Sequence, residues 1–502
     1  MEKIPATETY NTQLAMKIAM KKILLILTFI SAIILSSFVI QSSSFAAAPN
    51  IVLINADDLG WKDPSYAGSD FYETPHLDAL AASGMNFTQA YAGASLCQPS
   101  RACLMSGQTT PRHGNYAVKS TTNGPETLMR LVPVPNAMEL SGDTITLAET
   151  LKTAGYATGC FGKWHIGQGK KTGAGAQGFD VVTNVFAENK ANGVFDDPKD
   201  SISTTKNACE FITAQKGKPF FAYIAHHAIH SPHQSTQAAL EHFTAKKPGK
   251  LHSSVTYAAC VTALDDAVGQ VMKHLTDTGL DKSTLVIFTS DNGATSESPQ
   301  TPLRSGKAGY YEGGLRIPFL IRWPGKVTAG SRCDVPVTQL DLYPTLLDIS
   351  KAAAPKNQPL DGQSLLPLFE GRTDFVKRSF HWHFPGYWDG AISEDRDKIF
   401  RAKPVSVVRQ GDWKLMLFHE EWQLDGGRAK LANNNAVELY NLRDDLSESR
   451  NLAATQTSKR DAMLDELLTW LKQTQAPMPT QANPDYDPSK PFKSKKKKFA
   501  DE

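Results

Sequence analysis

Short apolar runs alternate with amphipathic segments from residue 50 to about residue 350 of the chain. Continuous apolar runs at residues 51–54, 219–225 and 285–288 have the pattern of strands that are buried on both faces. Between them, residues 253–275 carry apolar side chains at helical spacing along one stripe. Strands and helices that alternate in this way predict an α/β fold, in which helices cover both faces of a large, mostly parallel sheet.

Start and stop signals predict further elements. A threonine, a proline and a terminal glycine at the expected places predict a helix over residues 74–84. The other predicted elements are helices at 144–154 and 341–349 and strands at 156–161 and 318–323. Residues 117–142 show no period and are predicted to form a long surface insertion.

The pattern changes beyond about residue 375. Residues 405–408, 413–418 and 437–439 have the pattern of short strands, and leucines at helical spacing predict a helix over residues 464–471. We therefore expect a small antiparallel sheet with one helix. The predicted organisation is an N-terminal extension with a signal peptide over 1–48, the main α/β domain over 49–374, a small C-terminal α+β subdomain over 375–482 and a disordered basic tail over 483–502.

The N-terminal region has the layout of a secretory signal. Lys21 and Lys22 precede an almost unbroken apolar run at residues 23–40, and small residues follow at 42–48. The run is long enough for an uncleaved membrane anchor, but its alanine-rich end favours removal. We therefore expect an exported protein, periplasmic or secreted, without stable membrane insertion after signal removal.

Composition and charge exclude some classes of function. The chain has 502 residues, which is long enough for one large domain and a smaller one. Its 53 Lys and Arg residues nearly balance its 51 Asp and Glu residues, which gives no reason to expect nucleic-acid binding. Six cysteines in so long an exported chain do not indicate a disulfide scaffold, and their spacing assigns no pairing.

Polar clusters follow several of the predicted strands at the point where each strand ends. They are Asp57 and Asp58, Lys163 and His165, four histidines within residues 226–233, and Asp291 and Asn292. Each cluster, taken alone, is also typical of ordinary loop or core residues, and the histidine spacing fits no usual zinc site. Adjacent carboxylates suggest a hard-metal site. Ligands of parallel α/β sheets bind beyond the carboxyl ends of the strands, so we expect one shared site.

The most informative stretch is Cys97-Gln98-Pro99-Ser100-Arg101. Pro99 can open a helix, which puts Cys97 at or just before a helix N-terminus, where free N–H groups hold an anion. A buried cysteine that starts a core helix is the alternative for a lone cysteine. The spelling Cys-x-Pro-Ser-Arg resembles the signature in which type I sulfatases have their cysteine oxidised to formylglycine.

Taken together, the chain is similar to type I sulfatases of the alkaline phosphatase superfamily from residue 50 to residue 471. The motifs that carry the resemblance are Asp57-Asp58, residues 97–107, Gly162-Lys163-Trp164-His165, His230-Ser231-Pro232, Asp291-Asn292-Gly293, Gly306-Lys307 with Glu312-Gly313-Gly314, and residues 438–452. The resemblance implies an alkaline phosphatase-like fold and a sulfuric ester hydrolase.

The resemblance also implies roles for the site residues. The implied Ca²⁺ ligands are Asp57, Asp58, Asp291, Asn292 and an oxygen of the modified Cys97. The residues implied to orient the sulfate are Arg101, Lys163 and Lys307. His230 would protonate the leaving alcohol and His165 would help to deprotonate the formylglycine hydrate, although the two histidines could exchange these roles in part. One hydroxyl of the hydrate attacks sulfur and the other later expels inorganic sulfate. A formylglycine-generating or sulfatase-maturating enzyme is therefore an implied partner.

One segment bears on the substrate. Residues 381–388 concentrate aromatic rings, which suit stacking on sugars, but a buried seam between domains would use the same residues equally well. We favour a sulfated glycan, either polysaccharide or oligosaccharide. Two alternatives stay open: a phosphate mono- or diester hydrolase of the same superfamily, and an inactive glycan-binding protein that kept the fold.

Overall fold

The computed structural model describes residues 15–23, 48–186, 191–372, 375 and 377–490. The chain divides into two compact units, residues 1–48 and 49–502. In the first unit, residues 15–23 form an exposed helix, and most of the apolar run of the predicted signal, at 24–40, lies outside the described residues. No helix in the described part of the chain combines the length and the apolarity needed to cross a membrane.

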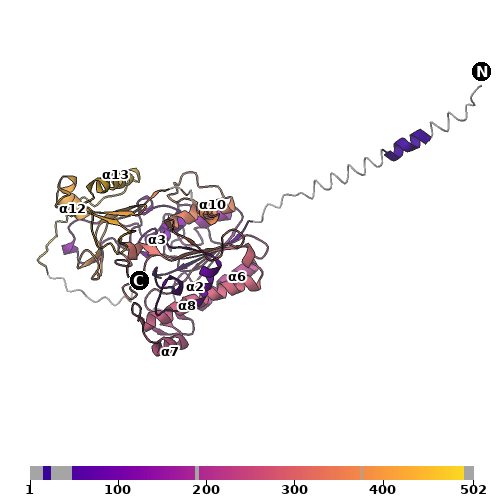
Figure 1. The fold of residues 1–502 in the computed structure, drawn as a ribbon, viewed down its shortest axis with the longest axis horizontal. Coiled ribbons are helices and arrows are strands. Elements are labelled where there is room, and N and C mark those ends of the chain that lie inside the picture. Colours follow the sequence, from indigo (N-terminus) through magenta and orange to yellow (C-terminus); the bar gives the residue numbers. More distant parts are fainter. Residues whose placement is uncertain (1–14, 24–47, 187–190, 373–374, 376, 491–502) are drawn as a thin grey trace, which may run out of the picture. The chain divides into compact units, whose positions relative to one another are not determined.

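A sheet of eight strands, counted within the described residues, forms the centre of the second unit (Figure 1). Its strand order is β12-β2-β11-β9-β1-β7-β4-β5. Strands β9, β1, β7, β4 and β5 run parallel, whereas β11 is antiparallel to both β9 and β2. The predicted mostly parallel sheet is therefore confirmed. The bounds are β1 Asn50–Ala56, β2 Met85–Phe87, β4 Ala157–Gly162, β5 Val181–Thr183, β7 Phe220–Ala225, β9 Thr284–Ser290, β11 Phe319–Arg322 and β12 Ser331–Cys333.

Alternate residues of the strands supply two separate hydrophobic cores. On β1, Ile51 and Leu53 face one core, and Val52 and Ile54 face the other. Both faces of the sheet are therefore covered by helices, and burial on both faces explains the continuous apolar runs in the sequence. The first core contains α3 (Cys97–Ser106), α5 (Leu147–Thr153) and α10 (Leu342–Ser350), and the second contains α2 (Pro75–Ser83), α6 (Ser201–Ala214), α7 (Gln237–Ala245) and α8 (Val255–Asp277) (Figure 1).

A second, antiparallel sheet lies in the C-terminal part, in the order β14-β17-β18-β19. Helix α13 (Thr457–Gln473) packs on one face of it through Leu464 and Leu467. The predicted small antiparallel sheet with one helix is thus confirmed, and β14 is an additional strand. The strand bounds are β14 Ser379–Phe384, β17 Val405–Gln410, β18 Trp413–Phe418 and β19 Val437–Asn441.

Short elements complete the fold. They are β3 (Ala90–Tyr91) between β10 (Arg316–Ile317) and β13 (Val337–Thr338), β6 (Gly193–Val194) with β8 (Gln234–Ser235), β15 (Trp388–Asp389) with β16 (Phe400–Ala402), and the helices α4 (Thr110–His113), α9 (Glu312–Leu315), α11 (Leu366–Phe369) and α12 (His419–Leu424).

The aromatic segment at residues 381–388 forms a buried seam. Trp382 and Tyr387 are only 3% and 0% exposed. The indole N–H of Trp382 donates to the Ala92 carbonyl at 2.9 Å, and Phe384 stacks on Tyr310 with 5.6 Å between ring centroids. The seam interpretation is confirmed. The sugar-stacking interpretation is wrong for these rings, because neighbouring rings of the fold already pack against them.

The segment at residues 117–142, predicted as a surface insertion, is half-buried or exposed along most of its length, but buried side chains anchor it to the fold. Leu131 and Leu140 are fully buried, and the N–H of Leu131 donates to the Tyr387 hydroxyl at 3.0 Å. The segment has no regular period because its apolar side chains meet partners that are distant in the sequence.

The predicted disordered tail is also wrong over residues 483–490. Asn483 donates from Nδ2 to the Met129 carbonyl at 2.8 Å, and the N–H of Asp487 donates to the Thr127 carbonyl at 2.8 Å. These polar contacts fasten the segment to the irregular stretch described above. The remainder of the predicted tail, residues 491–502, lies outside the described residues.

Candidate active site

Three neighbouring parallel strands end at the same edge of the central sheet. Backbone hydrogen bonds connect these ends: the Asp291 N–H donates to the Ala56 carbonyl at 3.1 Å, and the Ile229 N–H donates to the Asp57 carbonyl at 2.8 Å. The sheet thereby gathers polar groups from distant segments. The groups are Asp57 and Asp58 after β1, Asp291 and Asn292 after β9, and His230 in the loop after β7.

Helix α3 brings Cys97 and Arg101 to this edge. Cys97 is fully buried, and burial raises the pKa of its thiol to about 11, so the unmodified thiol is neutral and weakly nucleophilic. One turn further on, Arg101 donates from Nε and Nη2 to Asp291 Oδ2 at 2.9 and 2.7 Å. Its Nη1 donates to the Lys163 carbonyl at 2.9 Å and to the Tyr223 hydroxyl at 3.2 Å. Arg101 therefore connects the start of α3 to the ends of β9 and β4 and to Tyr223 within β7.

Two lysines pair with the adjacent carboxylates. Lys163 Nζ lies 2.9 Å from Asp57 Oδ2, and Lys307 Nζ lies 2.9 Å from Asp58 Oδ2. Burial raises the pKa of the Asp57 carboxyl, but the neighbouring cations, Lys163 foremost, outweigh burial and hold that pKa well below its usual range. The site is therefore a compact array of alternating negative and positive groups.

Two buried oxygens in this array accept no hydrogen bond from the described residues. They are Asp57 Oδ1 and Asn292 Oδ1, although Asn292 Nδ2 donates to Asp58 Oδ1 at 2.7 Å. Single ligand atoms of Asp57, Cys97 and Asp291 also lie within 4.8 Å of one another. Buried polar atoms without a partner need an explanation, and carboxylate and amide oxygens are the ligands that hard divalent cations prefer. The arrangement fits a bound Ca²⁺.

Two histidines border the array. His230 donates from Nδ1 to the Ser231 carbonyl at 2.5 Å, so its Nε2, which lies 3.8 Å from Asp58 Oδ2, is the nitrogen that faces the site. Burial, reinforced by Lys307, lowers the pKa of His230 to about 3. His165 has a left-handed backbone conformation, with φ of 63°, and its buried Nδ1 has no hydrogen-bond partner in the described part of the chain. Burial and the Lys163 charge hold the pKa of His165 well below its usual range.

The structure brings every predicted site residue to this edge of the sheet, and it adds others that the sequence did not indicate. Lys307 lies between Ser305 and Ala308, whose φ angles are 65° and 72°. The carbonyl of Lys307 accepts a hydrogen bond from Arg401 Nη1 at 3.1 Å. Asp395 accepts a hydrogen bond from the Ser305 hydroxyl at 2.5 Å, and it forms an ion pair with Arg401 Nε at 3.0 Å. Arg401, Asp395 and Tyr223 lie in no motif, so only the fold could reveal them.

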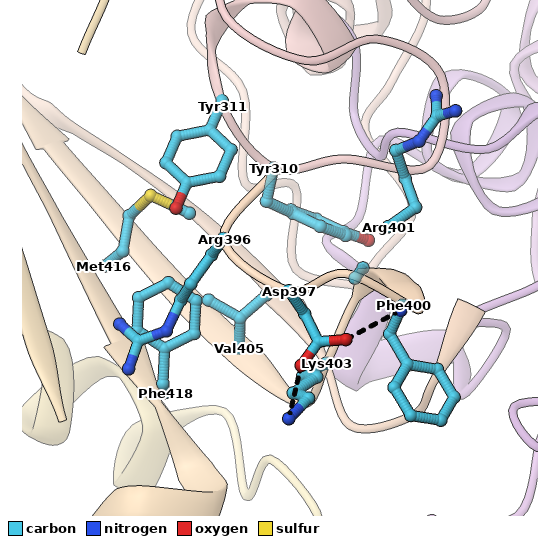
Figure 2. Close-up of a pocket in the computed structure, with 11 residues that line it drawn as sticks. Tyr310, Tyr311, Arg396, Asp397, Phe400, Arg401, Lys403, Val405, Met416 and Phe418 are labelled. Carbon is cyan, nitrogen blue, oxygen red and sulfur yellow. Dashed lines mark hydrogen bonds and ion pairs between the residues drawn. The ribbon is translucent and has the colours of Figure 1, made fainter. Parts of the chain in front are cut away.

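A small cavity lies beside this loop (Figure 2). Its volume of about 20 Å³ holds one water molecule and excludes a sugar. Figure 2 shows Asp397 between the Lys403 ammonium, at 2.8 Å, and the backbone N–H of Phe400, at 3.0 Å. Arg396 likewise pairs with Glu421 and Glu438. Because the cavity is this small and its cations are already paired, it is not itself a substrate site.

Known proteins share the sequence and the fold of this chain. Residues 49–352 match the family described as sulfatase, and residues 306–476 match the C-terminal region of N-sulphoglucosamine sulphohydrolase. A sulfatase of Formosa agariphila is 32% identical over 86% of this chain and 90% of its own length. Human arylsulfatase A is 32% identical over 81% of this chain and 84% of its own length. The crystal structure of Ps i-CgsB in complex with k-i-k-neocarrahexaose matches with a TM-score of 0.68 and 27% identity, over 86% of this chain and 94% of that one.

Proposed function

The chain belongs to the sulfatase family and is a sulfuric ester hydrolase, and from this premise we propose that it removes sulfate from a sulfated oligosaccharide or polysaccharide through a formylglycine made from Cys97 and a bound calcium ion. The observation that carries the proposal is the position of Cys97. It lies at the start of α3, and one of its atoms is within 4.8 Å of ligand atoms of Asp57 and Asp291.

The proposed calcium ligands are oxygen atoms of the array. They are those of Asp57, Asp58, Asp291 and Asn292, together with an oxygen of the modified residue at position 97. The Oδ1 atoms of Asp57 and Asn292 support this assignment, because neither accepts a hydrogen bond from the described residues, and the Arg101 Nη2 lies 3.6 Å from Asp57 Oδ1. When bound, the cation would act as a Lewis acid that stabilises negative charge on oxygen.

Formylglycine explains why the family signature contains a cysteine. A hydrated aldehyde would supply a hydroxyl nucleophile and a second hydroxyl that allows release of sulfate by C–O cleavage, which serine or a thiol cannot provide. The conversion requires a formylglycine-generating or sulfatase-maturating enzyme as a partner.

The other side chains of the site bind the ester and move protons. Arg101, Lys163 and Lys307 would hold the sulfate oxygens and neutralise their charge. Because Nδ1 of His230 is bound to the Ser231 carbonyl, Nε2 is the atom that would pass a proton to the leaving alcohol. The anionic substrate favours the protonated form of this histidine. His165, with an unpartnered Nδ1, would take a proton from the nucleophile at position 97.

Two observations support the glycan and its location. The matching structure of Ps i-CgsB holds k-i-k-neocarrahexaose, a carbohydrate oligomer. The signal-like N-terminal sequence favours an exported enzyme, periplasmic or secreted. An exported enzyme has access to polysaccharides outside the cytoplasm. Phosphate ester hydrolysis is the alternative activity, since the two esters share tetrahedral geometry.

The proposal is tested at position 97. Mass spectrometry of the peptide that contains residue 97, from protein coexpressed with a maturating enzyme, should find formylglycine. Cys97→Ala should lower sulfate release by about 1,000-fold or more, because it removes the nucleophile. The matched control is Cys103→Ser on the same helix, which is equally buried and should retain activity. An intact cysteine in active enzyme, or faster turnover of phosphate than of sulfate esters of one alcohol, would contradict the proposal.

A further inference from the structure

Lys199 is a buried cation outside every motif of the site. It belongs to the short 3-10 helix Pro198–Asp200 before α6, and it is only 4% exposed. Lys199 and Asp200 both have left-handed backbone conformations, with φ of 55° and 53°. Two consecutive residues other than glycine in this region are uncommon, and such strain clusters at functional sites where the surrounding structure maintains it.

The surrounding contacts place Lys199 beside the loop that carries His230. Its backbone N–H donates to Gln234 Oε1 at 2.8 Å. Gln234 is buried and begins β8, shortly after His230 and directly after His233. The strand pair β6 and β8 joins the two segments, and the Phe195 N–H donates to the Ser235 carbonyl at 3.0 Å. The position of Lys199 is therefore determined by the same loop as that of His230.

The ammonium group of Lys199 has no ion-pair partner among the described residues. Burial, the largest cause, lowers its pKa, and its charge in turn contributes to the lowered pKa values of His227 and His233. The Asp57 and Asp200 carboxylates act in the opposite direction and raise the pKa of Lys199, but neither forms an ion pair with it in the described part of the chain. A buried cation is costly unless an anion pairs with it. Lys163 and Lys307, by contrast, already have carboxylate partners.

We propose that Lys199 binds a second anionic group of the substrate, a sulfate or a carboxylate, next to the sulfate ester that is cleaved. The inference rests on the proposed function and names a feature of its substrate, a sugar with more than one negative group. The strained turn holds the lysine beside the His230 loop but outside the carboxylate array, so it can contact a neighbouring substituent and leave the scissile sulfate to Lys163 and Lys307. Lys199 is thus a residue for substrate selection.

Two pairs of substrates separate the two kinds of anion. κ-Neocarrabiose sulfate and ι-neocarrabiose sulfates differ by one sulfate. The 6-sulfated chondroitin disaccharide and its carboxyl-reduced form differ by the uronate carboxylate. The measurement is the ratio of kcat/KM within each pair and, for binding alone, the ratio of Kd values with the Cys97→Ala protein in calorimetry. The wild-type protein should prefer the member with the added anion in one pair, and that pair identifies the anion.

In that pair, Lys199→Met should reduce the preference at least 10-fold, and Lys199→Arg should retain part of it. The matched control is Lys206→Met on α6, an exposed lysine whose side chain is 72% accessible and which should leave the ratio unchanged. Equal ratios for the wild-type protein and Lys199→Met would overturn the inference, and so would binding of none of the four compounds. Binding with the expected ratio but without sulfate release by the unsubstituted enzyme would instead contradict the proposed function alone.

Discussion

Asn292 shows how a missing hydrogen bond can indicate the role of a side chain in the site. Asn292 directs Nδ2 toward Asp58 and the Gly293 carbonyl, yet its buried Oδ1 has no donor in the described part of the chain. An amide oxygen left in this state loses its hydration without compensation, unless a cation takes the place of water. The two hydrogen bonds donated by Nδ2 fix the orientation of the side chain, so that Oδ1 stays available as a ligand atom.

Replacing Asn292 by alanine should therefore weaken calcium binding. The calcium-induced rise in melting temperature of the purified protein should fall to less than half of the wild-type value, because one ligand is lost and stabilisation by a ligand follows its affinity. Asn115→Ala is the control, since Asn115 is also buried, also has an unpartnered Oδ1 and donates from Nδ2 to the Ala137 carbonyl at 2.9 Å. It should lower stability and leave the calcium shift intact. An undiminished calcium shift in Asn292→Ala would remove this residue from the ligand set.

At the scale of elements, apolar runs made the central strands predictable. Strands buried on both faces, such as β1 and β9, contain an unbroken run of four apolar residues, and chemistry-bearing residues directly follow these strands. Helix α6 was not predicted, because its many Ser and Thr residues weaken the helical pattern. Residues such as Arg401 and Tyr223 were not predicted either, since their roles depend on contacts across the fold that no local period records.

The Lys307 loop depends on β16 for its geometry. Arg401→Gln would remove the hydrogen bonds to the carbonyls of Lys307 and Gly390, the latter at 2.7 Å, and would leave the buried Asp395 without its cation. We expect kcat/KM for a sulfate ester to fall by about 10- to 100-fold, with weaker inhibition by inorganic sulfate, because misplacing a positioned group is costly. Arg401→Lys should retain only part of the wild-type kcat/KM, since lysine lacks the planar guanidinium that donates to both carbonyls.

The control for that series is Lys403→Gln. Lys403 directly follows β16, lines the cavity in Figure 2 and pairs with Asp397 and Glu420. Among the described residues it forms no ion pair or hydrogen bond with the Lys307 loop. It should change stability while sulfate inhibition stays as in the wild-type protein. If Lys403→Gln and Arg401→Gln weakened sulfate binding equally, the effect would come from destabilisation of this region and would contradict a positioning role for Arg401.

At the scale of the whole molecule, a buried charge cluster connects the C-terminal sheet to the catalytic half. Lys414 on β18 pairs with Glu312 of α9 at 3.1 Å and with Glu448 at 2.8 Å, and all three side chains are at most 1% exposed. Glu448 also accepts the N–H of Glu312 at 2.6 Å. The sequence predicted both halves, but it could not predict that charged residues this far apart would share one buried cluster.

This cluster should make stability depend on pH. Burial, with the Glu312 charge beside it, raises the pKa of Glu448 from 4.5 to about 7, so the folded protein holds a proton there that the unfolded chain releases. The contribution of this group to the free energy of unfolding is therefore largest below pH 4.5 and declines as the pH rises to 7, by up to about 1 kcal/mol per pH unit.

Urea unfolding of the wild-type protein and Glu448→Gln at pH 5, 6 and 7 should show the free energy of unfolding of the wild-type protein falling relative to that of the variant as the pH rises, because Gln does not titrate. Glu210→Gln, at a side chain that is 65% exposed, is the control and should follow the wild-type protein at each pH. A free energy of unfolding that rises with pH in the wild-type protein relative to Glu448→Gln would contradict this argument.

The burial of Cys97 also determines whether its oxidation must precede folding. No atom of this residue meets solvent once α3 has packed. Under the proposed chemistry, the oxidising enzyme must therefore reach the thiol while the chain is still extended, during synthesis or export. A molecule that folds first keeps its sulfur, and the active fraction of a preparation is fixed before the native state is complete.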